Sequence, residues 1–413
     1  MMDARTTSVP PPGRHGGRWP AHLEVVECPL TGRRLHLGRA WPRQGDHLLL
    51  EYLDEGDGTV AAQWFGDEAR ARAVAEETAR AAGPGMVAAV DGIGVVLQRR
   101  GADRRLPSLA PILQQEGSTM VVHRPERRAV IHRAGAAGSA TWIKVFRPGR
   151  LPQSVDAGEL PVPRQLRRDP EAGIIEYAEL AGVSLYHLLG QGRPALVVEA
   201  IGHAGRTLRR FHDSRPPDGL AVHDAGEEAA VTRRWVAHAR DHKALSVPAC
   251  RQATAALTRA TSMLEESRPS SPVALVHRDF HDKQVMVDGT GGIGLLDLDT
   301  LAMGDPALDV ANLLVHLELR SRQQHCSPGR SQRAAAAFLE GYQPGPELWD
   351  RVAAYALATR VRLACVYAFR PRWRSLAPRL LDGYGEQLQP STRKRYPMPR
   401  TVSMRSDPSL RRR

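Results

Sequence analysis

The chain has 413 residues, of which 42% are hydrophobic and 25% charged, and this composition is typical of a folded protein with two or three packed units. It excludes a wholly disordered chain and a fibrous repeat. The formal net charge of +12 lies mostly at the ends, because residues 391–413 carry eight Lys or Arg against one acid and residues 1–20 carry three against one. The rest of the chain is close to neutral, which argues against a nucleic-acid-binding domain.

The two basic ends contain Pro and Ser and predict solvated, disordered tails, although contact between the C-terminal tail and nucleic acid is an alternative. The start of the chain lacks the apolar core of a secretory signal, and arginines interrupt the most apolar late stretch, residues 352–369. The four cysteines lie at least 39 positions apart, which gives neither a metal-ligand pair nor a redox pair. We therefore expect a cytoplasmic protein without a membrane partner.

The first elements predicted along the chain are a β-hairpin and a helix. Two strand-like runs, residues 47–52 and 59–65, flank an Asp-Gly turn. Residues 67–82 have an acidic first turn and end at Gly83, as a helix should. A second pair of strands, at 87–90 and 94–98, completes a β-rich unit.

The same order of elements then recurs. Strands are predicted at 120–123 and 129–133, followed by a loop of small residues at 135–140, a strand at 141–146 and a segment at 173–182 that corresponds to residues 92–100. When Phe146 is aligned with Phe65, Lys144 falls on Gln63. This pattern predicts two copies of one β-rich lobe, of which only the second has the lysine. The alternative is chance, because hairpins and helices recur in many α/β chains.

From residue 193 onward the hydrophobic pattern becomes helical, with helices predicted at 195–213, 224–240, 249–266, 309–319, 332–342 and 348–369. Between them, residues 271–289 predict two apolar strands around a polar turn that holds His277, Asp279, His281 and Gln284. Asp297 and Asp299 come directly after the next apolar strand. Carboxylate and amide oxygens suit Mg²⁺, and together with a lysine and a proton-accepting carboxylate they meet the needs of phosphoryl transfer.

Three runs in this region, HRDFHDKQ (277–284), LLDLD (295–299) and GDPALDVAN (304–312), resemble the catalytic core of the aminoglycoside phosphotransferase family of kinase-like enzymes. WIKVF (142–146) is similar to the strand that bears the nucleotide lysine in that family, and the resemblance extends over residues 118–388. It implies Asp279 as the catalytic base, Gln284, Asp297 and Asp299 as metal ligands, and Lys144 and Glu179 at the nucleotide. His277, Asp305 and Asp309 would hold the catalytic loop in shape.

The sequence departs from the family pattern in three places. Position 284 is Gln where the family usually has Asn, a form that resembles the maltokinase and glucosamine kinase branch with its extra N-terminal domain. A glycine-rich loop is replaced by RPERR (124–128), so phosphate cover is expected from side chains there or from the loop at 135–140. The helix after the lysine strand is confined to residues 150–161, where Glu159 is one candidate partner of Lys144 and Glu76 of the first copy is another.

These observations predict an α+β fold, bilobal and protein-kinase-like, with an extra N-terminal β-rich cap domain. The expected divisions are a tail (1–20), the cap (21–116), a nucleotide lobe (117–181), a helical catalytic lobe (182–388) and a second tail (389–413). The resemblance implies transfer of a phosphoryl group from ATP or GTP, with Mg²⁺, to a hydroxyl of a small molecule such as an aminoglycoside, amino sugar or sugar. Antibiotic resistance and sugar metabolism both fit.

The acceptor of this reaction is expected near Asp279, His281 and Asp282, although a purely structural role is an alternative for His281 and Asp282. A second hypothesis is a degenerate kinase fold that binds a nucleotide or a partner protein without catalysis. Retention of Asp279, Asp297 and Lys144 favours the enzyme, because a binding module needs no base.

Overall fold

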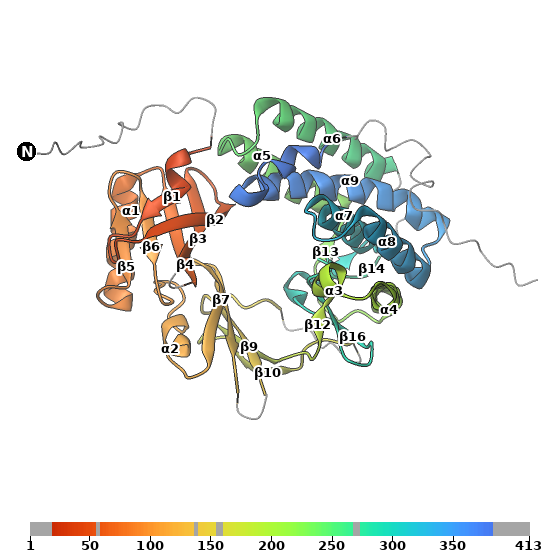
Figure 1. Ribbon diagram of the computed structural model, residues 1–413, viewed down its shortest axis with the longest axis horizontal. Coiled ribbons are helices and arrows are strands. Elements are labelled where there is room, and N and C mark those ends of the chain that lie inside the picture. The colour runs from red at the N-terminus through yellow and green to blue at the C-terminus, as the bar shows by residue number, and fades with distance from the viewer. Residues whose placement is uncertain (1–18, 55–57, 136–138, 154–159, 267–272, 383–413) are drawn as a thin grey trace, which may run out of the picture.

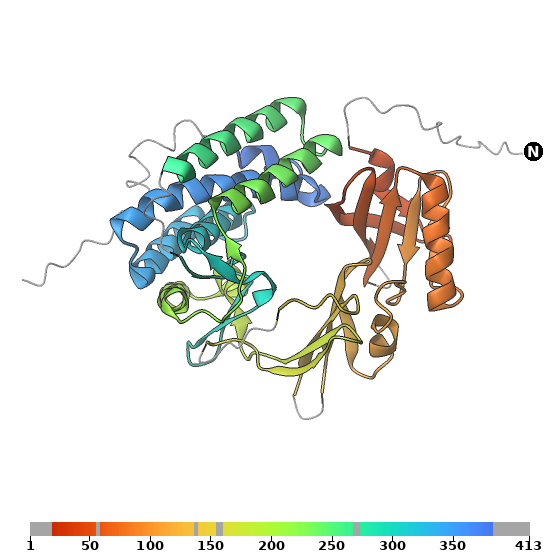
Figure 2. The same ribbon diagram turned by 180° about the vertical axis from the view of Figure 1, so that it is seen from behind.

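The computed structural model describes residues 19–54, 58–135, 139–153, 160–266 and 273–382. Two antiparallel sheets are followed by a mainly helical region, and Figures 1 and 2 show these parts following one another around a ring. The first sheet therefore lies beside the last helices of the chain. The tails expected at 1–20 and 389–413 fall almost entirely outside the described residues.

The first sheet has the strand order β1-β2-β3-β4-β6-β5. Its strands are β1 (Val25–Glu27), β2 (Arg34–Pro42), β3 (His47–Asp54), β4 (Gly58–Phe65), β5 (Val87–Val90) and β6 (Val95–Gln98), preceded by the short helix η1 (Ala21–Leu23). Helix α1 (Glu68–Ala82) follows β4 and packs through Val74 on Phe65 and Val96. The Asp67 side chain caps α1 by accepting the Ala69 N–H at 2.9 Å, and Gly83, at φ 89°, ends it. The predicted hairpin, helix and strand pair are confirmed.

The second sheet has the order β7-β8-β9-β11-β10 and consists of β7 (Ser118–Arg124), β8 (Arg128–Arg133), β9 (Thr141–Phe146), β10 (Gln165–Asp169) and β11 (Ile174–Ala178). Helix α2 (Leu109–Leu113) packs on one face of it, through Leu109 and Ile112 against Ile131 and Ile143. The helix expected within residues 150–161 is not found in the part of that segment that the structure describes, and Glu159 lies outside that part.

The helical region contains α3 (Leu185–Gln191), α4 (Pro194–Asp213), α5 (Ala225–Asp241), α6 (Val247–Glu266), α7 (Ala307–Arg322), α8 (Pro328–Tyr342), α9 (Pro346–Ala368), η5 (Pro371–Trp373) and α10 (Leu376–Arg379). All six helices predicted here are confirmed. Two small sheets lie among them: β12 (Val183–Ser184), β15 (Val285–Val287) and β16 (Ile293–Leu295) form one, and β13 (Val222–His223), β17 (Ala302–Gly304) and β14 (Ala274–Val276) form the other. Their connecting turns, including η4 (Leu298–Thr300), carry four of the predicted site residues, Asp279, Gln284, Asp297 and Asp299.

The first sheet is attached to the end of the helical region. Trp19 packs edge-on against Phe369 with 5.6 Å between ring centroids, and the Ala40 N–H donates to the Phe369 carbonyl at 2.9 Å. Arg374 forms an ion pair with Glu24. Buried apolar side chains of the first sheet and of α9 belong to one hydrophobic cluster, so burial holds these parts together. None of the described helices combines the length and apolar composition that a bilayer crossing requires.

Candidate active site

Asp309, in the first turn of α7, fixes the turn between β14 and β15 by hydrogen bonds. The buried Asp309 carboxylate accepts the His277 N–H at 2.7 Å and the Arg278 N–H at 2.8 Å. Arg278 has φ 69°, a left-handed conformation that non-glycine residues rarely adopt, and Asn312 donates to its carbonyl at 2.8 Å. This network fixes the backbone that precedes Asp279, while the Asp279 side chain stays 42% exposed.

His277 ties this turn to the acidic turn that follows β16. Its Nε2 lies 2.8 Å from the Leu296 carbonyl, and its own carbonyl accepts the Thr300 hydroxyl at 2.9 Å. The Leu296 N–H donates in turn to the Gln284 carbonyl at 2.8 Å. The predicted residues Asp279 and Gln284, in the turn between β14 and β15, and Asp297, in the turn after β16, are thus joined by hydrogen bonds into one unit.

Asp297 and Asp299 bind two cationic side chains from the second sheet. Lys144 Nζ lies 2.7 Å from an oxygen of each carboxylate, and Arg128 donates to Asp299 at 2.8 Å. Burial opposes ionisation of Asp297, but the charges of Lys144 and Arg128 hold its pKa well below its ordinary value. Burial likewise opposes the charge on Lys144, and the two carboxylates outweigh it and raise the pKa of Lys144. Burial and the neighbouring charge of Asp297 act the other way on Asp299 and raise its pKa.

The expected partner of Lys144 needs correction. Glu76, proposed as one candidate, is exposed on α1 and is not among the carboxylates that contact Lys144 in the described part of the chain. No helix is described between β9 and β10, and Lys144 instead pairs with Asp297 and Asp299 in the acidic turn of the helical region. The partner was not foreseen because the pair joins residues more than 150 positions apart, a contact that no local pattern predicts.

A cavity of about 700 Å³ lies on one side of this acidic pair. Lys144, Gln284, Asp297 and Asp299 line one end, and Trp142, Leu180, Met286 and Leu296 supply apolar walls. Glu179 stands at its rim, 41% exposed, where its carboxylate accepts the Trp142 indole N–H at 3.1 Å. The cavity thus joins an apolar pocket to a charged end, as a nucleoside phosphate would require.

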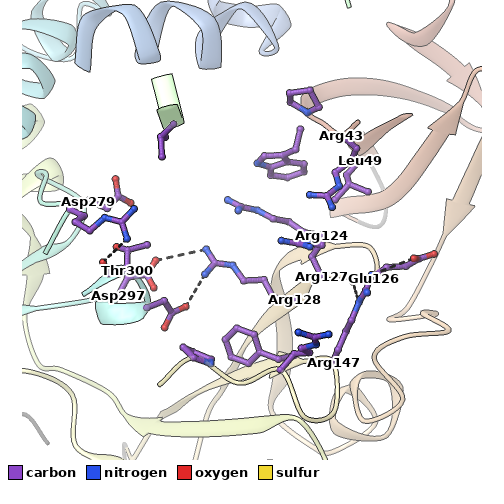
Figure 3. A pocket seen from close by; sticks show the side chains of 18 of the residues that line it. Arg43, Leu49, Arg124, Glu126, Arg127, Arg128, Arg147, Asp279, Asp297 and Thr300 are labelled. Atoms are coloured by element: carbon purple, nitrogen blue, oxygen red, sulfur yellow. Dashed lines mark hydrogen bonds and ion pairs between the residues drawn. The ribbon is translucent and has the colours of Figure 1, made fainter. Parts of the chain in front are cut away.

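A second cavity, of about 990 Å³, lies on the other side of Asp297 and Asp299. It is bounded by Trp41 of β2, by Arg43 in the turn that follows β2, by the β7–β8 turn at 124–128 and by Trp235 of α5. Figure 3 shows Asp279 and Asp297 on one side of this space and Arg124, Arg127 and Arg128 reaching toward them from the other. The sequence analysis named the turn at 124–128 as a candidate phosphate site but did not predict that residues 41–43 line the same cavity, because no local pattern marks residues 41–43 as functional.

The sequence analysis named two segments that could cover the phosphates, the turn at 124–128 and the loop at 135–140. Lys144 pairs with Val130 and Phe146 pairs with Arg128, so the β7–β8 turn lies at the same end of the sheet as the lysine. The loop between β8 and β9 begins beyond Arg133 at the opposite end. Arg128 of the turn therefore stands beside the acidic pair, whereas residues 136–138 of the loop lie outside the described residues.

For Asp282, the structure favours a purely structural role over contact with an acceptor. Its carboxylate is fully buried and accepts two hydrogen bonds from Arg320, at 2.7 and 2.9 Å. His281 stacks on His316 with 4.5 Å between ring centroids, and its Nε2 lies 3.8 Å from an Asp279 oxygen. His281 is therefore next to the candidate base, while Asp282 belongs to the packing beneath it.

Fold and site together define a small-molecule phosphotransferase with a kinase-like fold, in which two cavities meet at one pair of carboxylates. The sequence matches the phosphotransferase enzyme family, designated APH, over residues 112–355, which is more than half of the chain. The chain belongs to this family, and the resemblance to aminoglycoside phosphotransferases found in the sequence is confirmed. No curated protein matches the sequence.

Solved structures with a similar fold include an amicoumacin kinase in complex with AMP-PNP and Ca²⁺, with a TM-score of 0.50 and 13% identity, covering 69% of this chain and 91% of that one. An aminoglycoside phosphotransferase from Streptomyces rimosus has a TM-score of 0.43 and 19% identity, with 60% and 94% covered. A choline/ethanolamine kinase family protein from Mesorhizobium loti has a TM-score of 0.45 and 14% identity, with 69% and 93% covered. At these identities the likeness concerns the fold alone.

Proposed function

We propose that the protein transfers the γ-phosphoryl group of ATP or GTP to a hydroxyl of a small polar molecule. The observation that carries this proposal is the position of Asp297 and Asp299, which line both cavities at once. Lys144 stands on one side of this pair and Asp279 on the other. A phosphate donor and a hydroxyl acceptor can therefore meet at the carboxylates, which is the arrangement that in-line transfer requires.

The smaller cavity is the proposed nucleotide site. Its apolar walls, including Trp142 and Leu180, would hold the base, and Lys144 and Arg128 would contact the phosphates. The structures of similar fold support this assignment, since the amicoumacin kinase contains AMP-PNP and a second aminoglycoside phosphotransferase structure contains ADP. Glu179 at the rim is proposed to border the base rather than the phosphates.

The donor set fits a divalent cation. Asp297 and Asp299 already hold two cationic side chains, so this pair of oxygens attracts positive charge, and the Gln284 side chain lines the same cavity. One or two carboxylates with further oxygen ligands suit Mg²⁺. Bound there, Mg²⁺ would neutralise charge on the phosphates, and we propose Asp297, Gln284 and Asp299 as the residues that hold it.

Asp279 is proposed to act as the base. Its carboxylate accepts the proton of the acceptor hydroxyl, whose oxygen forms a bond to the γ-phosphorus as the bond from that phosphorus to the bridging oxygen breaks. The nucleoside diphosphate leaves with the electron pair of the broken bond. The fixed backbone at His277 and Arg278 orients Asp279, so little freedom is lost when the acceptor binds.

We also propose that the two sheets are copies of one lobe, the first being the cap and the second, with α2, the nucleotide lobe of a chain whose catalytic lobe is helical. Both place five strands in the same antiparallel order, β2-β3-β4-β6-β5 and β7-β8-β9-β11-β10. The Phe65 N–H donates to the Gly94 carbonyl at 2.9 Å, and the Phe146 N–H donates to the Gly173 carbonyl at 2.7 Å. This shared register supports the alignment of Gln63 with Lys144. The uncharged Gln63 fits a copy without nucleotide.

Replacement of Lys144 by Met is expected to raise the KM for ATP by about 10- to 100-fold, since hydrogen bonds to charged groups contribute about 1.5–3 kcal/mol. Lys243→Met, which removes an exposed lysine after α5, is the matched control and should leave the KM unchanged. The KM is measured by release of ADP, and nucleotide affinity by calorimetry with AMP-PNP. Equal nucleotide affinity in Lys144→Met and the native protein would refute the assignment of this cavity to the nucleotide.

A further inference from the structure

The cavity on the acceptor side is strongly basic. Eight arginines line it against five carboxylates; the arginines are Arg43, Arg124, Arg127, Arg128, Arg147, Arg150, Arg278 and Arg362. A wall of this composition attracts anions and repels a polycation. It therefore bears on which acceptor the site takes.

The carboxylates of the cavity are already engaged. Asp297 and Asp299 bind Lys144 and Arg128, while Glu126 lies 3.6 Å from Arg147 and Glu228 lies 3.6 Å from Arg362. Asp279 remains for the acceptor hydroxyl. The cavity's positive charge is therefore not balanced by its own acids.

Five arginines of the cavity have no carboxylate within 4.0 Å among the described residues: Arg43, Arg124, Arg127, Arg150 and Arg278. The Nε atoms of Arg124 and Arg278 are buried and have no hydrogen-bond partner in this part of the chain. Burial, together with the charges of Arg128 and Arg39, lowers the pKa of Arg124 to about 10. Burial of neighbouring positive charges without a partner is unfavourable in free energy, and a bound anion would reduce that penalty.

The first sheet keeps the arginine turn in place. The guanidinium groups of Arg39 and Arg124 both lie over the Trp41 ring, 4.7 and 4.9 Å from its centroid. At the tip of the turn, Glu126 adopts a left-handed φ of 58°, and its N–H donates to Asp103 at 2.7 Å. The Glu126 carboxylate accepts from Arg104 at 2.8 Å. These contacts fix the conformation of the β7–β8 turn without a bound ligand.

We infer that the acceptor is an anion, a small hydroxylated molecule that carries a carboxylate or a phosphate group bound by Arg43, Arg124 and Arg127. The guanidinium fork matches both groups in two-point hydrogen bonding. This inference rests on the proposed function, because it places the acceptor's hydroxyl beside Asp279. Arg43 lies in the turn between β2 and β3 and lines this cavity but not the cavity proposed for the nucleotide, so it can serve the acceptor.

The test measures binding of four probes to the full-length protein saturated with AMP-PNP and Mg²⁺: glucuronate, glucose 6-phosphate, glucose and glucosamine. We expect at least one anionic probe to bind about tenfold or more tighter than glucose, with an affinity that falls as salt rises, and glucosamine to bind no tighter than glucose. The comparison of glucuronate with glucose 6-phosphate shows whether a carboxylate or a phosphate is preferred.

Arg43→Gln and Arg127→Gln are each expected to weaken binding of the anionic probe by about fivefold or more while AMP-PNP affinity stays within about twofold. Arg72→Gln, which removes the same charge from the exposed face of α1, is the matched control and should change neither affinity. Either of two results overturns the inference: anionic probes that bind no tighter than glucose, or arginine variants that weaken AMP-PNP instead of the probe.

Failure of the proposed function has a different signature. A protein that binds the anionic probe but releases no ADP from ATP in its presence, and that shows no Mg²⁺-dependent affinity for AMP-PNP, supports the anion site and contradicts the phosphotransferase assignment of the two cavities. Turnover of glucose or glucosamine that Arg43→Gln leaves unchanged, without turnover of the anions, contradicts the inference alone.

Discussion

Replacement of Asp279 by Asn is expected to lower kcat for phosphoryl transfer by about 10²- to 10⁴-fold, the usual contribution of a positioned acid or base. The amide has nearly the same shape as the carboxylate but cannot accept the hydroxyl proton. Because Asp309 and Asn312 hold the adjoining backbone, the variant should keep the fold of the turn. Release of ADP in the presence of an accepted hydroxyl compound measures the effect.

Nucleotide affinity separates a lost base from a damaged site. Asp279 does not line the proposed nucleotide cavity, so Asp279→Asn should bind AMP-PNP within about twofold of the native protein. Asp213→Asn removes an exposed carboxylate at the end of α4 and should leave kcat unchanged. If Asp279→Asn keeps kcat within a few-fold of the native value, then Asp279 is not the base.

The second large effect is expected from Arg320, whose loss leaves the buried Asp282 carboxylate without its ion-pair partner. Arg320 contributes two hydrogen bonds to that carboxylate, at 2.7 and 2.9 Å, and a third to Gln323 at 2.7 Å. Removal of one partner of a buried pair typically costs about 3–5 kcal/mol. Arg320→Leu should therefore lower the free energy of unfolding by about that amount, measured by urea denaturation. A loss under about 1 kcal/mol would show that the pair does not stabilise the fold.

The pH dependence of this effect has a defined sign. Burial favours the neutral form of Asp282, but His281 and Arg320 hold its pKa well below its ordinary value. In the native protein this carboxylate therefore stabilises the fold at pH values above its ordinary pKa, and the stabilisation is lost as the pH falls toward its lowered pKa. In Arg320→Leu, the effect of burial on Asp282 is no longer opposed by the charge of Arg320, so the pKa of Asp282 rises. The difference in unfolding free energy between the native protein and Arg320→Leu should accordingly be smaller near pH 4 than at pH 7. A difference in unfolding free energy that does not change with pH would contradict this account. The double variant Arg320→Leu with Asp282→Leu should be more stable than Arg320→Leu alone, because it no longer buries an unpaired carboxylate.

The sequence predicted those parts of the protein that depend on local pattern. Alternating strands, helix periodicity and the Asp67 and Gly83 signals placed α1, the hairpin and six C-terminal helices within a few residues of their observed ends. The catalytic motifs were recognisable because their residues are close in sequence. The alignment of Phe65 with Phe146 rests on a local order that two strands repeat, and it stays a proposal, supported by the N–H of each phenylalanine donating to a glycine carbonyl.

Only the tertiary structure decided which charges meet. Lys144 pairs with Asp297 and Asp299, Asp282 turns inward to Arg320, and Arg43 joins the turn at 124–128 around one cavity. Each of these contacts joins segments that lie far apart in the chain, and the partners are chosen by packing and by the need to neutralise buried charge. Periodicity describes how one segment buries its own face, but the partners of a charged side chain depend on every segment that folds against it.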